Sequence, residues 1–139
     1  GAEQQGIKLM LVSGYRSYGL QQSVYNGNVA REGQANADKT SARPGHSEHQ
    51  TGLAADLGTT SGLCRLESCF GQTPEGRWLA EKAHVYGFVV RYPENKQNIT
   101  GYTYEPWHMR YVGKELAAEV YQSGLTLEQF FGLPAAPAY

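Results

Sequence analysis

Residues 47–56 read Ser-Glu-His-Gln-Thr-Gly-Leu-Ala-Ala-Asp and place His49 seven residues ahead of Asp56. The histidine lies in a polar, glycine-bearing stretch, whereas the aspartate ends a run of small and apolar residues typical of a short strand. A turn followed by a strand can bring two such side chains back to one point. Imidazole nitrogen and carboxylate oxygen are both zinc ligands. Residues 47–56 therefore predict two metal ligands where a loop enters a sheet.

A second cluster, Glu-Pro-Trp-His at residues 105–108, supplies a third ligand and a base. Catalytic zinc sites commonly have three protein ligands and a water, and a glutamate can accept the proton of that water. His108 and Glu105 fill these roles. Residues three apart face opposite sides of a regular strand, so the hypothesis requires Pro106 and Trp107 to bend or bulge the chain.

Taken singly, these residues also have ordinary structural interpretations. A histidine in a glycine-rich loop, such as His49, is more often a surface residue than a ligand. Asp56 could merely cap the following turn. Only the combination of the two clusters makes a metal site the better interpretation.

The rest of the chain predicts strands mixed with helices. Because they do not alternate as βαβ units, we expect an α+β domain with a mainly antiparallel sheet and flanking helices. Caps support two of the helices: Thr73 precedes proline and glutamate, and Thr126 and Gln129 have capping-box spacing. Residues 33–52 are expected to form a polar loop. Strands are predicted at residues 8–12, 53–57, 88–92 and 102–111, and helices at residues 18–32, 74–86, 114–122 and 126–131.

Length and charge limit the classes of function. A chain of 139 residues suits one domain, and residues 133–139, with two prolines, are expected to form a linker-like tail. The formal net charge is -1 and the basic residues are scattered, which argues against a nucleic-acid-binding protein. No apolar run approaches the roughly 18 residues of a membrane helix, so we expect no direct membrane insertion of this fragment. We expect a monomer.

Two cysteines, Cys64 and Cys69, are separated by four residues. This spacing permits a local disulfide, which would indicate an oxidising compartment, and it equally permits two reduced thiols in a loop. The count alone favours neither alternative.

The motifs together resemble a known family. Ser-x-His-x-x-Gly-x-Ala-x-Asp at residues 47–56, followed by Glu-x-x-His at residues 105–108, is similar to the signature of the D-alanyl-D-alanine metallopeptidases. These are the VanY-type carboxypeptidases of the lysostaphin, D-Ala-D-Ala peptidase and hedgehog fold class. The similarity extends to residues 14–17 with Gln21, to residues 42–45 and to residues 106–111. It covers about residues 9 to 121, with no departure at a metal or base position.

The resemblance implies a single metallopeptidase catalytic domain over residues 1–139, with one Zn²⁺ on an open groove. It implies that His49, Asp56 and His108 hold the metal and that Glu105 is the base. The expected activity is hydrolysis of the bond before a C-terminal D-alanine of peptidoglycan stem peptides. The expected location is extracytoplasmic in a bacterium, by secretion or through an anchor absent from this chain.

Four further residues are expected to contact the substrate: Arg16, Gln21, Ser47 and Trp107. Arg16 offers a planar fork of donors for a carboxylate or for the oxyanion of the reaction, so it is also a candidate catalytic residue. A structural salt bridge is its alternative role, and ordinary polar contacts are the alternatives for Gln21 and Ser47. Of the remaining histidines, His46 is expected at the rim of the site and His84 in a structural role.

Three other functions are alternatives to the carboxypeptidase. An endopeptidase or dipeptidase would use the same chemistry elsewhere in the stem peptide, and the sequence does not separate D,D- from L,D-cleavage. A catalytically silent peptidoglycan-binding module would have lost its base, and the presence of Glu105 argues against it. A serine acyl-transfer enzyme would need a Ser-x-x-Lys motif, which the chain lacks.

Overall fold

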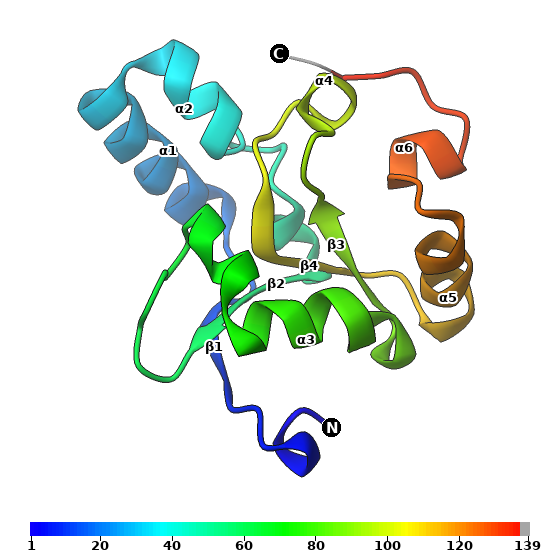
Figure 1. The fold of residues 1–139 in the computed structure, drawn as a ribbon. Coiled ribbons are helices and arrows are strands. Elements are labelled where there is room, and N and C mark those ends of the chain that lie inside the picture. Colours follow the sequence, from blue (N-terminus) through cyan, green and yellow to red (C-terminus); the bar gives the residue numbers. More distant parts are fainter. Residues whose placement is uncertain (137–139) are drawn as a thin grey trace.

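Four antiparallel strands form the sheet at the centre of the computed structural model, which describes residues 1–136 (Figure 1). Their spatial order is β1-β2-β4-β3, and all three pairings are antiparallel. The predicted α+β class with an antiparallel sheet is confirmed. The strands are β1 (Leu9–Ser13), β2 (Ala54–Thr59), β3 (Phe88–Tyr92) and β4 (Glu105–Tyr111).

Helices flank this sheet (Figure 1). Helix α3 lies against one face, where its Leu79 packs with Phe70 and Met109. Helix α5 covers Val89 of β3 on the other face of the sheet. The next residue, Val90, points back to the α3 face and packs with Leu79, Phe70 and Met109. The helices are α1 (Tyr18–Glu32), α2 (Gln34–Thr40), α3 (Pro74–Lys82), α4 (Gln97–Thr100), α5 (Lys114–Ser123) and α6 (Leu127–Phe130), with 3₁₀ turns at Glu3–Gln5, Glu48–Thr51, Ser68–Gln72 and Ala83–Tyr86.

Local capping explains why the predicted helix boundaries agree with the structure. The Thr73 side chain accepts a hydrogen bond from the backbone N–H of Gly76, and Pro74 occupies the first helical position of α3. The helix then tightens into a 3₁₀ turn and ends at Gly87, whose φ of 88° suits glycine. Thr126 and Gln129 form the reciprocal capping box of α6.

The prediction of a continuous polar loop over residues 33–52 was wrong, because α2 and the turn at Glu48–Thr51 lie within it. In α2 only Ala37 is buried, so this seven-residue helix has no periodic apolar face that a sequence could display. Helix α4 likewise occupies a stretch expected to be turns, and β4 begins at Glu105 rather than at residue 102.

The last described residue, Ala136, contacts the segment of helix α4. The backbone N–H of Ala136 donates to the carbonyl of Ile99, 2.8 Å away. The tail predicted over residues 133–139 also includes residues 137–139, which lie outside the described residues. Within residues 1–136, no helix combines the length and the apolar character needed to cross a membrane.

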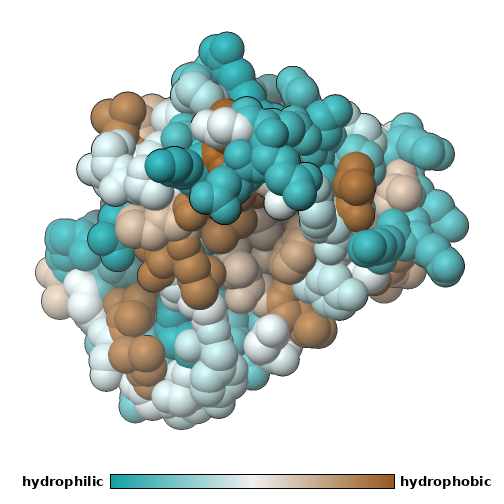
Figure 2. Space-filling view, turned by 90° about the horizontal axis from the view of Figure 1, so that it is seen from below, coloured by the Kyte–Doolittle hydropathy of each residue, from teal (hydrophilic) through white to brown (hydrophobic). Residues whose placement is uncertain are grey.

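An apolar hollow opens on the side of the molecule seen in Figure 2, where brown and pale side chains gather. It corresponds to a cavity of about 510 Å³ whose lining includes Leu9, Leu57, Trp78, Leu79 and Met109. This hollow lies on the α3 face of the sheet, whereas the polar residues singled out by the sequence lie on the other face.

Candidate metal centre and active site

Strands β2 and β4 place two predicted ligands side by side. Asp56 of β2 is the direct partner of His108 of β4 in the antiparallel register. Directly opposed residues point to the same face of a sheet. The Asp56 carboxylate oxygen Oδ1 lies 3.0 Å from Nδ1 of His108, and both side chains are buried.

The third predicted ligand, His49, comes from the turn that precedes β2. The turn ends at Gly52, whose φ of 74° lets the chain reverse into the strand. Nδ1 of His49 lies 2.7 Å from the carbonyl oxygen of Gly14, and Nε2 lies 3.1 Å from Oδ2 of Asp56. One ligand atom from each of His49, Asp56 and His108 falls within 4.8 Å of the other two. The structure thus brings the three predicted ligands together.

The hydrogen bonds of the two histidines show that this cluster suits a cation. A carbonyl oxygen only accepts, so Nδ1 of His49 carries a hydrogen, and Nε2 is the ring nitrogen that faces Asp56. When Nε2 carries a lone pair, a proton or a metal ion must lie between it and the Asp56 carboxylate oxygen, 3.1 Å away. The ligand atoms of one tetrahedral Zn²⁺, each about 2.0–2.2 Å from the metal, lie roughly 3.4 Å from each other. The distances from the Asp56 carboxylate to His49 and to His108, 3.1 Å and 3.0 Å, are close to this value.

His108 shows the same preference for positive charge. Its Nε2 lies 3.3 Å from Oε2 of Glu48, while Nδ1 faces Asp56. Burial opposes protonation of the imidazole, but hydrogen bonds to Asp56 and Glu48 outweigh burial and raise the pKa of His108 to about 9. The carboxylates therefore stabilise a cation at this point.

Glu105 reaches the ligands because the pairing of β3 with β4 is irregular. Val90 pairs with Met109 and Tyr92 pairs with Glu105, so a step of two residues on β3 spans four residues on β4. This is the distortion that the sequence hypothesis required. Oε2 of Glu105 lies 3.9 Å from Nδ1 of His108. Burial, only partly offset by the charge of His108, raises the pKa of the Glu105 carboxyl to about 8.

Arg16 is held beside the ligands by two side chains. Its guanidinium donates to Oε1 of Gln21 at 2.8 Å and to Oγ of Ser13 at 3.0 Å, and it lies 3.8 Å from Oδ2 of Asp56. Gln21 is fully buried and donates its own amide hydrogen to the carbonyl of Ala42. Gln21, expected to contact substrate, thus has both ends of its amide engaged within the protein and orients Arg16.

A polar cavity of about 500 Å³ surrounds these groups. Arg16, Ser47 and Trp107, which the sequence predicts to contact substrate, line this cavity together with the candidate ligands and Glu105. Its outer wall comes from α1, α2 and the loop after β2, with Val24, Asn28, Arg31, Glu32, Thr40 and Leu66.

The two other histidines lie elsewhere: His46 is exposed, and His84 stacks on Tyr121 of α5 with ring centroids 3.8 Å apart.

Sequence reasoning missed an ionic array behind His108. Oε1 of Glu48 accepts hydrogen bonds from Nε of Arg91 at 2.7 Å and lies 2.9 Å from the guanidinium of Arg110. Arg91 also donates to Oε1 of Glu128 at 2.5 Å. The sequence contains little indication of this array, because the motif leaves position 48 unspecified and the two arginine partners of Glu48 lie 43 and 62 residues away. The indication that the sequence did contain was an acidic residue, Glu48, directly before the predicted ligand His49.

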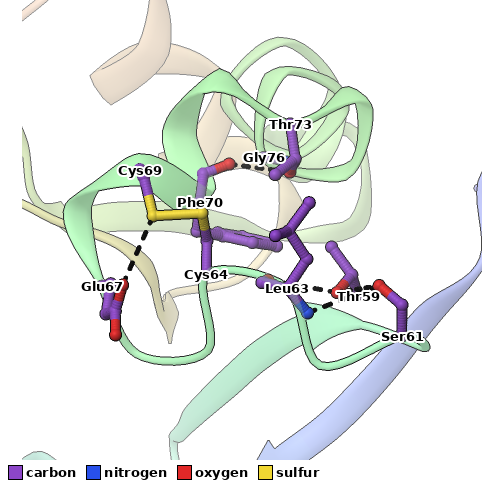
Figure 3. Close-up of a disulfide and its surroundings, with 9 residues drawn as sticks. All are labelled: Thr59, Ser61, Leu63, Cys64, Glu67, Cys69, Phe70, Thr73 and Gly76. Carbon is purple, nitrogen blue, oxygen red and sulfur yellow. Dashed lines mark hydrogen bonds between the residues drawn. A yellow bond between two sulfur atoms is a disulfide. The ribbon is translucent and has the colours of Figure 1, made fainter.

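Cys64 and Cys69 form a disulfide in the loop between β2 and α3 (Figure 3). The question that the sequence left open is thus answered in favour of the bond. The loop also includes Leu66, which borders the polar cavity with a φ of 55°, a conformation that leucine rarely adopts. The disulfide closes the chain around this residue.

We expect the double variant Cys64→Ser/Cys69→Ser to fold with a modestly lower melting temperature. The closed loop is short, so the loss of stability should be below the ~3 kcal/mol expected for a fifteen-residue loop. Thermal unfolding of parent and variant measures the difference. Thiol titration of unreduced protein isolated from its native host should detect no free sulfhydryl, and two free sulfhydryls would contradict the bond.

Comparisons with known proteins agree with this geometry. The sequence model of the family described as VanY: D-alanyl-D-alanine carboxypeptidase matches residues 1–114. Among curated proteins, the chain is 47% identical over 130 residues to the "Putative carboxypeptidase YodJ" of Bacillus subtilis (strain 168), covering 94% of this chain and 48% of that protein. The chain therefore spans about half the length of this relative.

Two solved structures are similar over nearly the whole chain. The LdcB LD-carboxypeptidase superposes with a TM-score of 0.86 at 46% identity, covering 94% of this chain and 61% of that one. A variant of the vancomycin-resistance D,D-pentapeptidase VanY, in complex with Zn(II), superposes with a TM-score of 0.82 at 37% identity, covering 94% and 75%. The similarity thus includes both an LD- and a D,D-cleaving relative and a zinc complex.

Proposed function

Because the chain belongs to the VanY family of D-alanyl-D-alanine carboxypeptidases, we propose that it is a zinc carboxypeptidase that removes a C-terminal D-alanine from peptidoglycan stem peptides. The observation that carries this proposal is the convergence of His49, Asp56 and His108 beside Glu105 in one polar cavity. The zinc complex of VanY and the LdcB carboxypeptidase support the metal and the reaction class. Such a substrate places the protein outside the cytoplasm of a bacterium.

The donor set indicates which atoms would hold the metal. Nδ1 of His49 is engaged by a carbonyl and Nε2 of His108 by Glu48, so His49 would bind through Nε2 and His108 through Nδ1, with the Asp56 carboxylate between them. The chemistry that Zn²⁺ supplies in such a site is polarisation of the scissile carbonyl and a lowered pKa of a water molecule.

Glu105 is the group that moves protons. Its carboxylate projects from the irregular start of β4 toward the ligand cluster, and it is almost fully buried. In the proposed reaction Oε2 accepts a proton from the attacking water and returns it to the leaving amine of D-alanine. A carboxyl whose pKa is raised toward neutrality by burial can take part in both transfers.

Arg16 holds the substrate in register with these groups. Gln21 and Ser13 fix the guanidinium at the wall of the cavity, so its remaining donors point in a set direction. An arginine held in this way can bind the terminal carboxylate of a stem peptide through two parallel hydrogen bonds. The oxyanion of the reaction is the other negative charge that it could meet.

We expect Arg16→Ala to harm acid-terminated peptides most and nearly to erase the preference over C-terminal amides. Steady-state kinetics on a matched acid and amide pair measure this effect, with zinc content as a check on the site. The exposed Arg77 of α3 gives the control Arg77→Ala. Equal slowing of both substrates, by about 10²–10³-fold, would instead assign Arg16 to the oxyanion.

Mass spectrometry of synthetic tetra- and pentapeptide stems tests the proposed function. Loss of one D-alanine from the pentapeptide indicates D,D-cleavage, and loss of the last residue of the tetrapeptide indicates L,D-cleavage. Release of a dipeptide would indicate a dipeptidase instead of a carboxypeptidase. An internal cut would indicate an endopeptidase. A chain that binds zinc and leaves both peptides intact would be a binding module.

A further inference from the structure

A row of charged side chains connects His108 to helix α6. Nε2 of His108 faces Oε2 of Glu48 at 3.3 Å, and Oε1 of the same carboxylate accepts from Nε of Arg91 at 2.7 Å. The other end of the Arg91 guanidinium donates to Glu128 of α6 at 2.5 Å. Arg110 approaches Glu48 from β4 at 2.9 Å.

The sheet explains why these groups meet. On β4, Met109 packs toward α3, so its neighbours His108 and Arg110 point to the opposite face. On β3, Val89 contacts the α5 side, and Arg91, two residues on, lies on that same face. The capped turn at the start of α6 then brings Glu128 to Arg91. The metal ligands and α6 therefore share one face of the sheet.

Stability alone does not account for this array. The side chains of Glu48, Arg91 and Glu128 are 14%, 14% and 9% exposed, so each charge is largely removed from water. Within residues 1–136, Nη1 of Arg91 and Oε2 of Glu128 have no hydrogen-bond partner. Buried ion pairs with unsatisfied groups contribute little net stability, because desolvation offsets their attraction.

We propose that Glu48 is a positioning residue for His108. Helix α6 in turn fixes the orientation of the Glu48 carboxylate, because Glu128 of α6 holds Arg91 and Arg91 holds Glu48. A hydrogen bond from Nε2–H to Glu48 sets the tautomer that leaves Nδ1 free to bind metal, and a carboxylate partner makes the imidazole a stronger ligand. The inference rests on the proposed function in that His108 is taken as a zinc ligand. Helix α6 lies beyond residues 1–114, the part matched by the family's sequence model.

Zinc affinity and a cobalt spectrum test this role without relying on activity. In competition with a chromophoric chelator, Glu48→Gln should bind Zn²⁺ about 10–100-fold more weakly than the parent. Glu128→Gln, which does not touch a ligand, should show a smaller loss in the same direction. Both variants should change the visible absorption of the Co²⁺-substituted protein, because the geometry at His108 changes. The exposed Glu119 of α5 provides the control Glu119→Gln, which should leave affinity and spectrum unchanged.

A double variant separates positioning from general loosening of the fold. Because Glu128 acts on His108 only by way of Arg91 and Glu48, Glu48→Gln/Glu128→Gln should lose little more zinc affinity than Glu48→Gln alone. Parental affinity and an unchanged Co²⁺ spectrum in both single variants would overturn the inference, even if their melting temperatures fell. With a parent that binds zinc and trims peptides, that result leaves the proposed function intact, whereas a parent that binds no zinc overturns both.

Discussion

Replacing Glu105 with glutamine is expected to lower hydrolysis of stem peptides by about 10²–10⁴-fold, with zinc content and melting temperature near those of the parent. The amide is nearly the same size as the carboxylate but cannot accept a proton from water. The Glu105 side chain is buried, and its Oε2 lies 3.9 Å from Nδ1 of the candidate ligand His108. Single-turnover assays on a pentapeptide and elemental analysis measure the two quantities.

The matched control is Glu81→Gln on the exposed side of α3, which should leave turnover unchanged. Turnover near the parental rate in Glu105→Gln would mean that another group is the base. Glu48, which also lines the cavity, would then be the first carboxylate to examine.

Removing any one of the three ligands should abolish both zinc binding and activity. His49→Ala, Asp56→Ala and His108→Ala should each weaken zinc affinity by more than the 10–100-fold typical of losing a partner of a ligand. Each deletes a donor atom from a cluster within 4.8 Å, and the two remaining donors cannot complete a three-ligand site. Elemental analysis after dialysis and chelator competition measure the loss.

His46→Ala is the control, because this exposed residue lies outside the ligand group. Its zinc content should match that of the parent, and a loss would show that the ligand set has been assigned in the wrong register. Full zinc occupancy in Asp56→Ala would remove Asp56 from the set and leave a site of two histidines.

Those elements that depend on short-range interactions were predictable from the sequence. The boundaries of α1, β3 and α3 follow from caps and apolar runs within a few residues of each end, and the structure places them as expected. Helix α2 was missed because its single buried residue, Ala37, is held by packing and shows no pattern along the chain.

The candidate site divides in the same way. The side-chain chemistry of His49, Asp56 and His108, and the turn that joins the first two, are local properties, so the sequence by itself determined which residues could form a metal centre. Whether Glu105 could join them depended on a pairing irregularity between β3 and β4, because strand register arises from contacts across the sheet. Only the tertiary structure decided that Gln21 holds Arg16 from within the protein and that Glu48, Arg91 and Glu128 form an array behind His108. Those partners lie 37 and 43 residues apart, and folding alone brings such distant charges within hydrogen-bonding distance.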